Sequence, residues 1–397
     1  MFDPASVRIR GPLRAHVMGF WADLLRQGYA PGSALNLLRV AAHLGRWLKA
    51  KGLALHDLTE DAAGRFLRYR CRQGYRRLFT GRALGPVLGY LRCVGAVPEA
   101  VRREDTSPAG CLVREYASYL ARERGLTASA VRTYTDFARR FVRDERPRLD
   151  WGRLTAADVT GFVLRKSRRA SLPSCKCTVT CLRSLLRFLH VKGAIRQDLA
   201  SCVPAVAGWR LAGLPTALEA SQIDRLLSCF DRSPTGLRDA AVVTLMLRLG
   251  LRAGEVAALQ LEDVDWRAGE LSVHGKGQHH SRLPLPEDVG RALAAYLRRG
   301  RPCASARSLF LRRAPYAGMR SGAIIHVARA ALRRAGVIGG AHLLRRTAAT
   351  QLLRHGASLP EIAHVLRHRH IDTTAIYAKV DLASLGALAQ PWPGGAP

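Results

Sequence analysis

The 397-residue sequence predicts a mainly helical protein with a small β-hairpin in its C-terminal domain. Apolar residues recur at three- and four-residue steps through residues 20–48 and again through 115–142, which is the pattern of amphipathic helices. Residues 270–275 instead alternate apolar and polar side chains, and a polar turn separates them from a second short run at 282–286. That arrangement predicts two paired strands with Lys276 at the turn between them.

The two helical regions resemble each other. Setting Gly28 against Gly125 aligns an amphipathic helix before each glycine and a long helix after it, at an offset of 96 to 97 residues. We interpret the pair as a duplicated helical domain with its seam near residues 107–110. Two unrelated helical hairpins that share a generic pattern remain the alternative.

The pattern of the sequence changes near Leu214. Apolar periodicity then predicts helices at 219–230, 236–250, 288–299 and 320–335, on either side of the hairpin. The final QPWPGGAP is rich in proline and glycine and is expected to be disordered. The expected divisions are an additional N-terminal helical domain at 1–107, a second helical domain at 108–205, a linker at 206–218, a C-terminal domain at 219–389 and a tail at 390–397.

Positive charge dominates the composition. The chain has 63 lysines and arginines against 30 acidic residues, a formal net charge of +33 and an isoelectric point of about 11.2. Such a chain favours polyanionic partners, above all nucleic acid, because each neutralised phosphate releases counterions. A solubilising excess of charge, a ribosomal protein and a membrane-surface protein remain alternatives. The apolar content of 48% excludes disorder over most of the chain.

The sequence favours a soluble protein of a reducing, cytoplasmic compartment. Charged residues interrupt any apolar N-terminal run, and the longest apolar run, 240–247, is too short to span a bilayer. Nine cysteines, an odd number, fit free thiols better than a disulfide framework. We expect no metal site at Cys175, Cys177 and Cys181, because no second pair with zinc-site spacing accompanies them.

Arginines concentrate without acidic neighbours in both helical regions. Residues 65–82 hold seven arginines and no acid, and no acid occurs between Asp158 and Asp198. Because arginines on both sides of a helix favour a nearby anion, we predict a phosphate-contacting surface in each region, with a solvated basic face as the alternative. The predicted DNA-binding residues are Arg65, Arg68, Arg72, Arg165, Lys166, Arg168, Arg169, Lys176, Arg183 and, on the hairpin, Arg282.

Six residues of the C-terminal domain suit the cleavage of a phosphodiester without a metal ion. The transition state spreads extra negative charge over the non-bridging oxygens, so two guanidiniums such as Arg252 and Arg345 can replace a metal. A tyrosine hydroxyl, with an ordinary pKa of about 10, needs cations or a base to act as a nucleophile, and a departing alkoxide needs a proton. The remaining candidates are the nucleophile Tyr377, the general acid Lys276 and the assisting histidines His342 and His368.

Each of these residues alone has an ordinary explanation as a surface ion pair, an exposed turn lysine or a half-buried tyrosine. Their joint order and spacing, however, resemble the tyrosine recombinase, or phage integrase, family. The resemblance covers about 215–385 and, more loosely, 108–205. The matching residues are Arg252 in GLRAGEV, Lys276 in the hairpin, His342 and Arg345 in HLLR, and His368 followed nine residues later by Tyr377.

The resemblance implies tandem helical SAM-like DNA-binding domains followed by a tyrosine recombinase catalytic domain. It also implies that Tyr377 attacks the scissile phosphate to give a 3′-phosphotyrosyl enzyme and a free 5′ hydroxyl, while Arg252 and Arg345 clamp the phosphate. Glu255 and Asp263 would be supporting acids. No cofactor is expected, because the covalent link conserves the energy of the broken bond.

Two positions depart from the family's pattern. Arg367 stands where the family commonly has glycine before the histidine, and we expect this change to alter how His368 meets the phosphate. His279 and His280 occupy a part of the hairpin turn that is often lysine-rich, and we expect weaker or altered DNA contact there.

The expected partner is double-stranded DNA, enclosed by a C-shaped clamp and bound by a homotetramer on two sites of a phage, plasmid or other mobile element in a bacterial cell. Other recombinases and DNA-bending proteins are further possible partners. By resemblance, residues 381–390 are a segment exchanged between neighbouring subunits. The alternatives are a type IB topoisomerase, a non-catalytic DNA-binding relative and a metal-dependent transposase or nuclease. The sequence leaves open the target site, the biological outcome and the role of the additional N-terminal domain.

Overall fold

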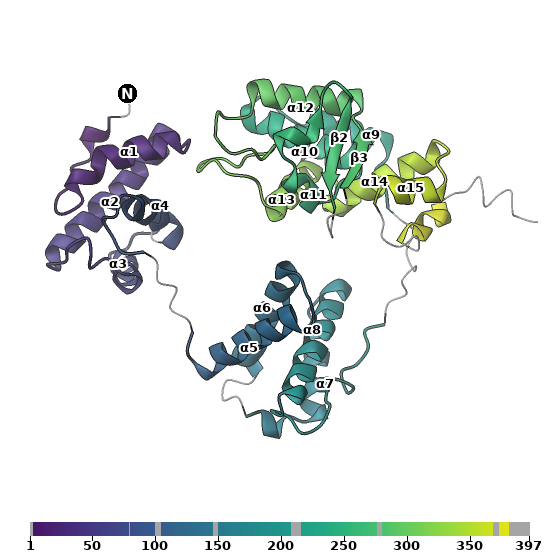
Figure 1. Ribbon diagram of the computed structural model, residues 1–397, viewed down its shortest axis with the longest axis horizontal. Helices are drawn as coiled ribbons and strands as arrows, with labels where there is room; N and C mark the ends of the chain where they lie inside the picture. Colours follow the sequence, from purple (N-terminus) through teal and green to yellow (C-terminus); the bar gives the residue numbers. More distant parts are fainter. Residues whose placement is uncertain are drawn as a thin grey trace, which may run out of the picture. The chain divides into compact units, whose positions relative to one another are not determined.

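The computed structural model describes residues 3–78, 80–99, 105–145, 150–207, 216–275, 280–367 and 373–380. These residues are mainly helical and include one three-stranded sheet (Figure 1), which confirms the predicted fold class. Contacts divide the chain into two compact units, one of Val101–Ala212 and the other of Met1–Ala100 together with Gly213–Pro397. The domain boundaries expected from the sequence stay predictions. The three largest apolar cores lie within residues 9–97, 112–203 and 218–344.

Helices surround the first of these cores. The second α-helix around this core begins at Pro31, a position where a backbone N–H would have no partner within the helix, so that the N–H missing from proline costs no hydrogen bond. The third is capped by Thr59, whose hydroxyl accepts a hydrogen bond from the Ala62 N–H at 3.4 Å. The elements are η1 (Pro4–Ser6), η2 (Arg14–His16), α1 (Val17–Arg26), α2 (Pro31–Ala50), α3 (Glu60–Arg72) and α4 (Gly81–Cys93).

The second core also lies among helices. Its centre is formed by fully buried side chains such as Tyr116, Leu182 and Leu186. A hydrogen bond of 2.9 Å from the Tyr116 hydroxyl to Ser184 Oγ satisfies the polar end of that tyrosine. The elements are α5 (Pro108–Arg122), α6 (Ala128–Glu145), η3 (Trp151–Arg153), α7 (Ala156–Ser167) and α8 (Leu172–Val191).

The two helical regions share a sequence of local signals. Gly28 and Gly125 each follow the first helix of their region with φ in the left-handed range, +85° and +58°. Thr59 and Thr155 each cap the third helix through the side-chain oxygen. This order of elements agrees with the duplication inferred from the sequence, and the duplication itself stays a prediction.

The third core lies in the C-terminal region and has α10 at its centre. The apolar run 240–247 falls in this helix, and its side chains from Ala241 to Leu247 are buried. Predicted and observed helices agree to within two residues; α10 begins earlier than predicted because Ser233 caps it and Pro234 follows as its first residue. The helices are α9 (Ala220–Ser228), α10 (Pro234–Arg248), α11 (Ala253–Ala258), α12 (Glu287–Arg299), α13 (Ser321–Arg334), α14 (Ala341–Arg354) and α15 (Leu359–Val365), with η4 (Leu261–Asp263) and η6 (Ala375–Val380).

The sheet consists of β1 (Val264–Asp265), β2 (Glu270–His274) and β3 (His280–Pro284), all antiparallel in that order. The predicted hairpin is therefore present, and β1 adds a third strand that is too short to show an alternating pattern. Strand β3 starts at His280, inside the segment predicted as a turn. The reason is cross-strand pairing, because His280 lies opposite His274 and their rings meet edge to face at 4.6 Å.

No helix in the described part of the chain is long and apolar enough to cross a membrane. All nine cysteines are free thiols, with Cys175 and Cys181 buried and Cys177 exposed. Within the same described ranges, no three potential metal ligands of the His, Cys, Asp or Glu type lie together. The candidate exchange segment 381–390 and the tail 390–397 lie outside the described residues.

Candidate active site

Arg252 stands at the start of α11, where the chain turns after α10. Gly250 permits this turn, since its φ of +58° lies in the left-handed region. Glu255 accepts one hydrogen bond from the Arg252 backbone N–H at 2.8 Å and another from Arg252 Nη1 at 2.7 Å. The carboxylate thereby holds the guanidinium in place, while 45% of the Arg252 side chain remains exposed and able to meet a ligand.

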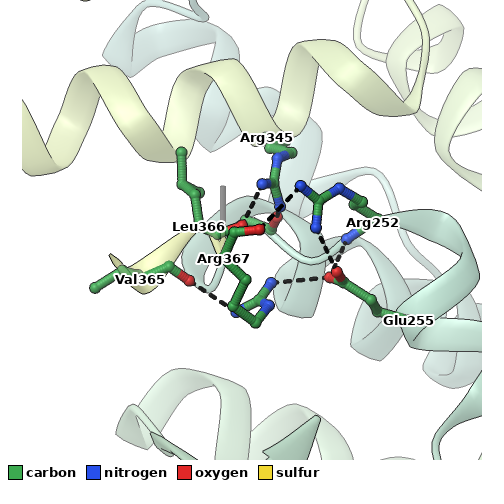
Figure 2. A network of polar contacts seen from close by, with 7 residues as sticks. Arg252, Glu255, Arg345, Val365, Leu366 and Arg367 are labelled. Atoms are coloured by element: carbon green, nitrogen blue, oxygen red, sulfur yellow. Dashed lines mark hydrogen bonds and ion pairs between the residues drawn. The ribbon is translucent and has the colours of Figure 1, made fainter. Parts of the chain in front are cut away.

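Arg345 lies in α14 and is 3% exposed. Its Nη1 donates to the Gly250 carbonyl at 2.6 Å. Its Nη2 donates to the Leu366 carbonyl, as Figure 2 shows. Burial, followed by repulsion from Arg252, lowers the pKa of Arg345 to about 9. The guanidinium is therefore still charged at neutral pH, and it joins α14 to the segments that follow α10 and α15.

A third guanidinium, that of Arg367, approaches the same carboxylate (Figure 2). Arg367 Nη2 donates to Glu255 Oε2 at 2.8 Å, and the two side chains are only 8% and 6% exposed. Arg367 Nη1 donates to the Val365 carbonyl at 2.7 Å, and the Arg367 carbonyl accepts from Arg252 Nη2 at 3.2 Å. The sequence identified this position only as a departure from glycine. No local pattern indicates that its side chain would meet Glu255, which lies 112 residues away along the chain.

Tyr377 lies in η6 and is 4% exposed. Burial raises the pKa of its phenol above the usual value of 10, and the positive charges of Arg345 and Arg346 oppose that rise. The phenol is therefore neutral at physiological pH in this state, although it lies within reach of the charge on Arg345. Its buried apolar neighbours are Ala349, Ile362 and Leu366.

His342 occupies α14 one turn before Arg345, so the two side chains share a face of the helix. The ring remains partly open to solvent. The protein atoms that surround the rest of the ring, and then the charges of Arg346, Arg345 and Arg252, lower its pKa. His342 is consequently neutral at physiological pH and able to accept a proton. Arg346 was not singled out in the sequence, although it directly follows Arg345.

Asp263 lies apart from this group, at the base of the sheet. It accepts a hydrogen bond from the Gln260 N–H at 2.8 Å, and its other oxygen lies 2.7 Å from His274 Nε2. Since His274 ends β2, Asp263 anchors the hairpin that leads to Lys276. Within the described residues, the hydrogen bonds of the Asp263 carboxylate are thus with Gln260 and with the hairpin residue His274.

Arg345 connects groups from segments far apart in the chain, since the charges of Arg252 and Glu255 act on Arg345 and the charge of Arg345 acts on Tyr377. Lys276, His279 and His368 lie outside the described residues. The roles expected for Lys276 and His368 therefore rest on the family resemblance.

The predicted DNA-binding side chains are exposed with one exception. Arg183 is half-buried and donates from Nη2 to the Val203 carbonyl at 2.8 Å. Arg65 and Arg165 each pair with a neighbouring carboxylate, at 2.5 Å and 2.7 Å, and remain accessible. The exposed positions are Arg65, Arg68, Arg72, Arg165, Lys166, Arg168, Arg169, Lys176 and Arg282.

Residues 216–383 match the model of the phage integrase family. The chain is 40% identical over 396 residues to the putative integrase/recombinase y4rA of Sinorhizobium fredii (strain NBRC 101917 / NGR234), an alignment that covers 97% of this chain and 96% of that protein. It is 30% identical over 308 residues to the tyrosine recombinase XerD of Mycobacterium tuberculosis (strain CDC 1551 / Oshkosh), over 71% of this chain and 96% of that one. The chain belongs to the phage integrase family.

A solved structure shares the fold. The crystal structure of a lambda integrase tetramer bound to a Holliday junction matches with a TM-score of 0.53 at 16% sequence identity, over 76% of this chain and 87% of that chain. The resemblance inferred from residue spacing is thereby confirmed at the level of family and fold.

Proposed function

We propose that this protein is a site-specific DNA recombinase that cuts and rejoins strands through a 3′-phosphotyrosyl intermediate. The observation that carries the proposal is the position of Arg345. It is bonded to Gly250, two residues before Arg252, and to Leu366, which packs with Tyr377. The charge of Arg345 acts on both Arg252 and Tyr377. One buried cation thus links the candidate clamp to the candidate nucleophile.

The two arginines suit a phosphate that gains charge during the reaction. Each guanidinium has part of its donor set committed to protein oxygens, which fixes its orientation before a ligand arrives. Donors held in advance stabilise developing negative charge without reorganising in the transition state. We assign Arg252 and Arg345 to the non-bridging oxygens of the scissile phosphate.

Tyr377 is the proposed nucleophile, and it must lose its proton to attack phosphorus. The neutral ring of His342 is a candidate acceptor on the same side of α14 as Arg345. When the Tyr377 oxygen bonds to phosphorus, the bond to the 5′ oxygen breaks and that oxygen takes up a proton. We assign the donation to Lys276 and the assistance to His368, both on the family's pattern.

The proposed substrate is double-stranded DNA of a phage, plasmid or other mobile element, with two sites joined by a homotetramer. The lambda integrase of the same fold is a tetramer on a Holliday junction, which supports this assembly as a proposal for the present chain. The formal charge of +33 supports a polyanionic partner.

A two-plasmid assay tests the function. The DNA site is first identified by trapping the covalent complex that the protein forms with the genomic DNA flanking its gene. Two marked plasmids then each carry that site. We expect recombinant plasmids in excess EDTA and without ATP, because the phosphotyrosyl link retains the energy for rejoining. Loss of supercoils without exchange would indicate a type IB topoisomerase. DNA binding without cleavage would indicate a non-catalytic relative. A requirement for a divalent metal would indicate a metal-dependent transposase or nuclease.

The exposed arginines of α3 are proposed to contact DNA phosphates. The triple variant Arg65→Gln, Arg68→Gln and Arg72→Gln should lower the slope of log affinity against log salt by roughly 0.9 for each phosphate that the variant leaves without a cation. A fluorescence anisotropy titration between low and moderate salt measures the slope. Replacing the exposed Arg8, Arg10 and Arg14 with glutamine provides a control of equal charge. Equal slopes for the two triple variants would mean that α3 contributes net charge and no specific phosphate contacts.

A further inference from the structure

We propose that Arg367 is a positioning residue of the active site, which neutralises Glu255 and so leaves the charge of Arg252 available to the scissile phosphate. The inference rests on the proposed recombinase function. It gives a role to a side chain at a position that the family commonly fills with glycine.

The backbone at Arg367 shows why glycine is common there. Its φ is +55°, in the left-handed region that side chains with a Cβ disfavour. A glycine would adopt this conformation at lower cost, so local backbone geometry does not explain the arginine. A contribution from the side chain must offset the conformational cost.

The side chain is buried and directed at one carboxylate. Arg367 Nη2 lies 2.8 Å from Glu255 Oε2, and the arginine side chain is only 8% exposed. Arg367 Nε has no hydrogen-bond partner among the described residues, so the guanidinium is not fully satisfied by its surroundings. An arginine that only filled space would have the free-energy cost of desolvating its guanidinium, with no ion pair to offset that cost.

Among the residues that the structure describes, Glu255 otherwise has one cation as its direct partner, Arg252. A carboxylate paired with Arg252 alone would cancel most of the charge that this guanidinium offers to a phosphate. With Arg367 present, two guanidiniums contact the carboxylate and the charge of a third, that of Arg345, interacts with it, which leaves an excess of two positive charges in the site. Without Arg367 the excess is one. The extra charge matters most in the transition state, where the phosphate carries more negative charge than in the bound substrate.

The protonation of Glu255 agrees with this arrangement. Burial alone raises the pKa of this carboxyl, but the charge of Arg367, followed by the hydrogen bond from the Arg252 N–H and those from both guanidiniums, outweighs the burial. The pKa of Glu255 therefore lies below its ordinary value. Glu255 stays ionised and keeps its hold on Arg252 even in mildly acidic solution.

Arg367 also acts through its main chain. Its carbonyl accepts a hydrogen bond from Arg252 Nη2 at 3.2 Å, on the other side of the guanidinium from Glu255 (Figure 2). The same residue therefore fixes Arg252 directly by its backbone and indirectly by its side chain. Substitution of the side chain leaves the carbonyl in place and isolates the second effect.

The test measures single-turnover cleavage of a nicked suicide duplex. The duplex contains the cleavage site identified by covalent trapping on the DNA that flanks the gene. Arg367→Met keeps the side-chain length and removes the charge, and we expect cleavage to fall by about 10- to 100-fold with DNA affinity nearly unchanged. Arg367→Lys should recover part of the rate. Arg354→Met, an exposed arginine at the end of α14, is the matched control and should cleave as the wild type does.

Two further readouts separate positioning from structural support. With Arg367→Met the pKa of Glu255 rises, so Glu255 becomes protonated at a higher pH than in the wild type. Protonation removes the carboxylate charge that Arg367 would neutralise, so the cleavage defect of the variant should become smaller as the pH falls. In a Glu255→Gln background the carboxylate charge is gone, so adding Arg367→Met should cost little more. An equal loss in both backgrounds, or wild-type cleavage by Arg367→Met, overturns the inference.

Failure of the proposed function would look different. A wild-type protein that forms no adduct with any trapped DNA removes the recombinase assignment, and the role of Arg367 falls with it. A wild-type protein that forms the adduct while the Arg367 variants equal it removes only the inference. If Arg367→Met does not fold, Arg367→Gly fits the left-handed backbone and tests the same loss of charge.

Discussion

The Tyr377→Phe variant should bind its DNA site like the wild type and form no covalent adduct with a nicked suicide substrate. The variant lacks only the oxygen that is proposed to bond to phosphorus. Loss of the nucleophile in enzymes with a covalent intermediate removes most of the rate enhancement, so we expect cleavage to fall by at least about 10⁴-fold. Denaturing electrophoresis of labelled DNA detects the adduct directly.

The fold should tolerate this change. Phenylalanine fits a pocket formed by Ala349, Ile362 and Leu366, and the stability should change by no more than about 1 kcal/mol. Tyr296→Phe is a matched control, because Tyr296 is also buried in this part of the chain and its hydroxyl accepts a hydrogen bond from the Leu311 N–H at 3.1 Å. That variant should lose about 1 kcal/mol and still form the adduct. Persistence of the adduct in Tyr377→Phe would show that another residue is the nucleophile.

Arg345→Ala should reduce single-turnover cleavage by about 10³-fold or more, because it removes a cation that we propose stabilises the developing charge of the phosphate. The same substitution removes the hydrogen-bond donor of the Gly250 and Leu366 carbonyls, which in the wild type accept from the Arg345 guanidinium. Leaving buried acceptors unsatisfied costs about 1–3 kcal/mol each, so stability should also fall. Thermal unfolding and cleavage must therefore be measured together.

A second substitution separates catalysis from stability. Arg345→Lys retains the charge but loses the planar fork, so it should restore stability more than it restores cleavage. Arg248→Gln is the control, since Arg248 belongs to the same part of the chain and pairs with Asp288 at 2.6 Å outside the site. Full cleavage by Arg345→Lys would show that a positive point charge suffices and that the fork geometry is unimportant.

Much of the helical structure was predictable, because short-range apolar periodicity decides it. The helices at 219–230 and 236–250 were expected within two residues of α9 and α10. Their exact starts depend on local caps, and Ser233 before Pro234 is such a signal in the sequence. Strand β1 was not predictable in this way, since two residues cannot display a period and depend on β2 for their hydrogen bonds.

The contacts within the candidate site were not predictable from the sequence, and the roles of its residues stay predictions. The chemistry and spacing of Arg252, Arg345 and Tyr377 predict a common site, and in the structure the charge of Arg345 acts on both of the others. Arg183 shows the reverse case: it was selected as one of several basic residues, and its guanidinium donates to the Val203 carbonyl. Nothing in a run of basic residues distinguishes a side chain that faces solvent from one that turns back to the backbone.

The sequence by itself predicts a basic, helical member of a family that uses tyrosine to break phosphodiesters. It can do so because periodicity, charge and motif spacing are local properties of the chain. Chain folding determined the rest: that Arg345 donates hydrogen bonds to Gly250 and Leu366, that Tyr377 is buried, and that the Arg367 side chain pairs with Glu255. The physical reason is that these contacts join residues up to 112 positions apart. Their energies depend on burial and on the directions of individual side chains, which arise only when the helices pack.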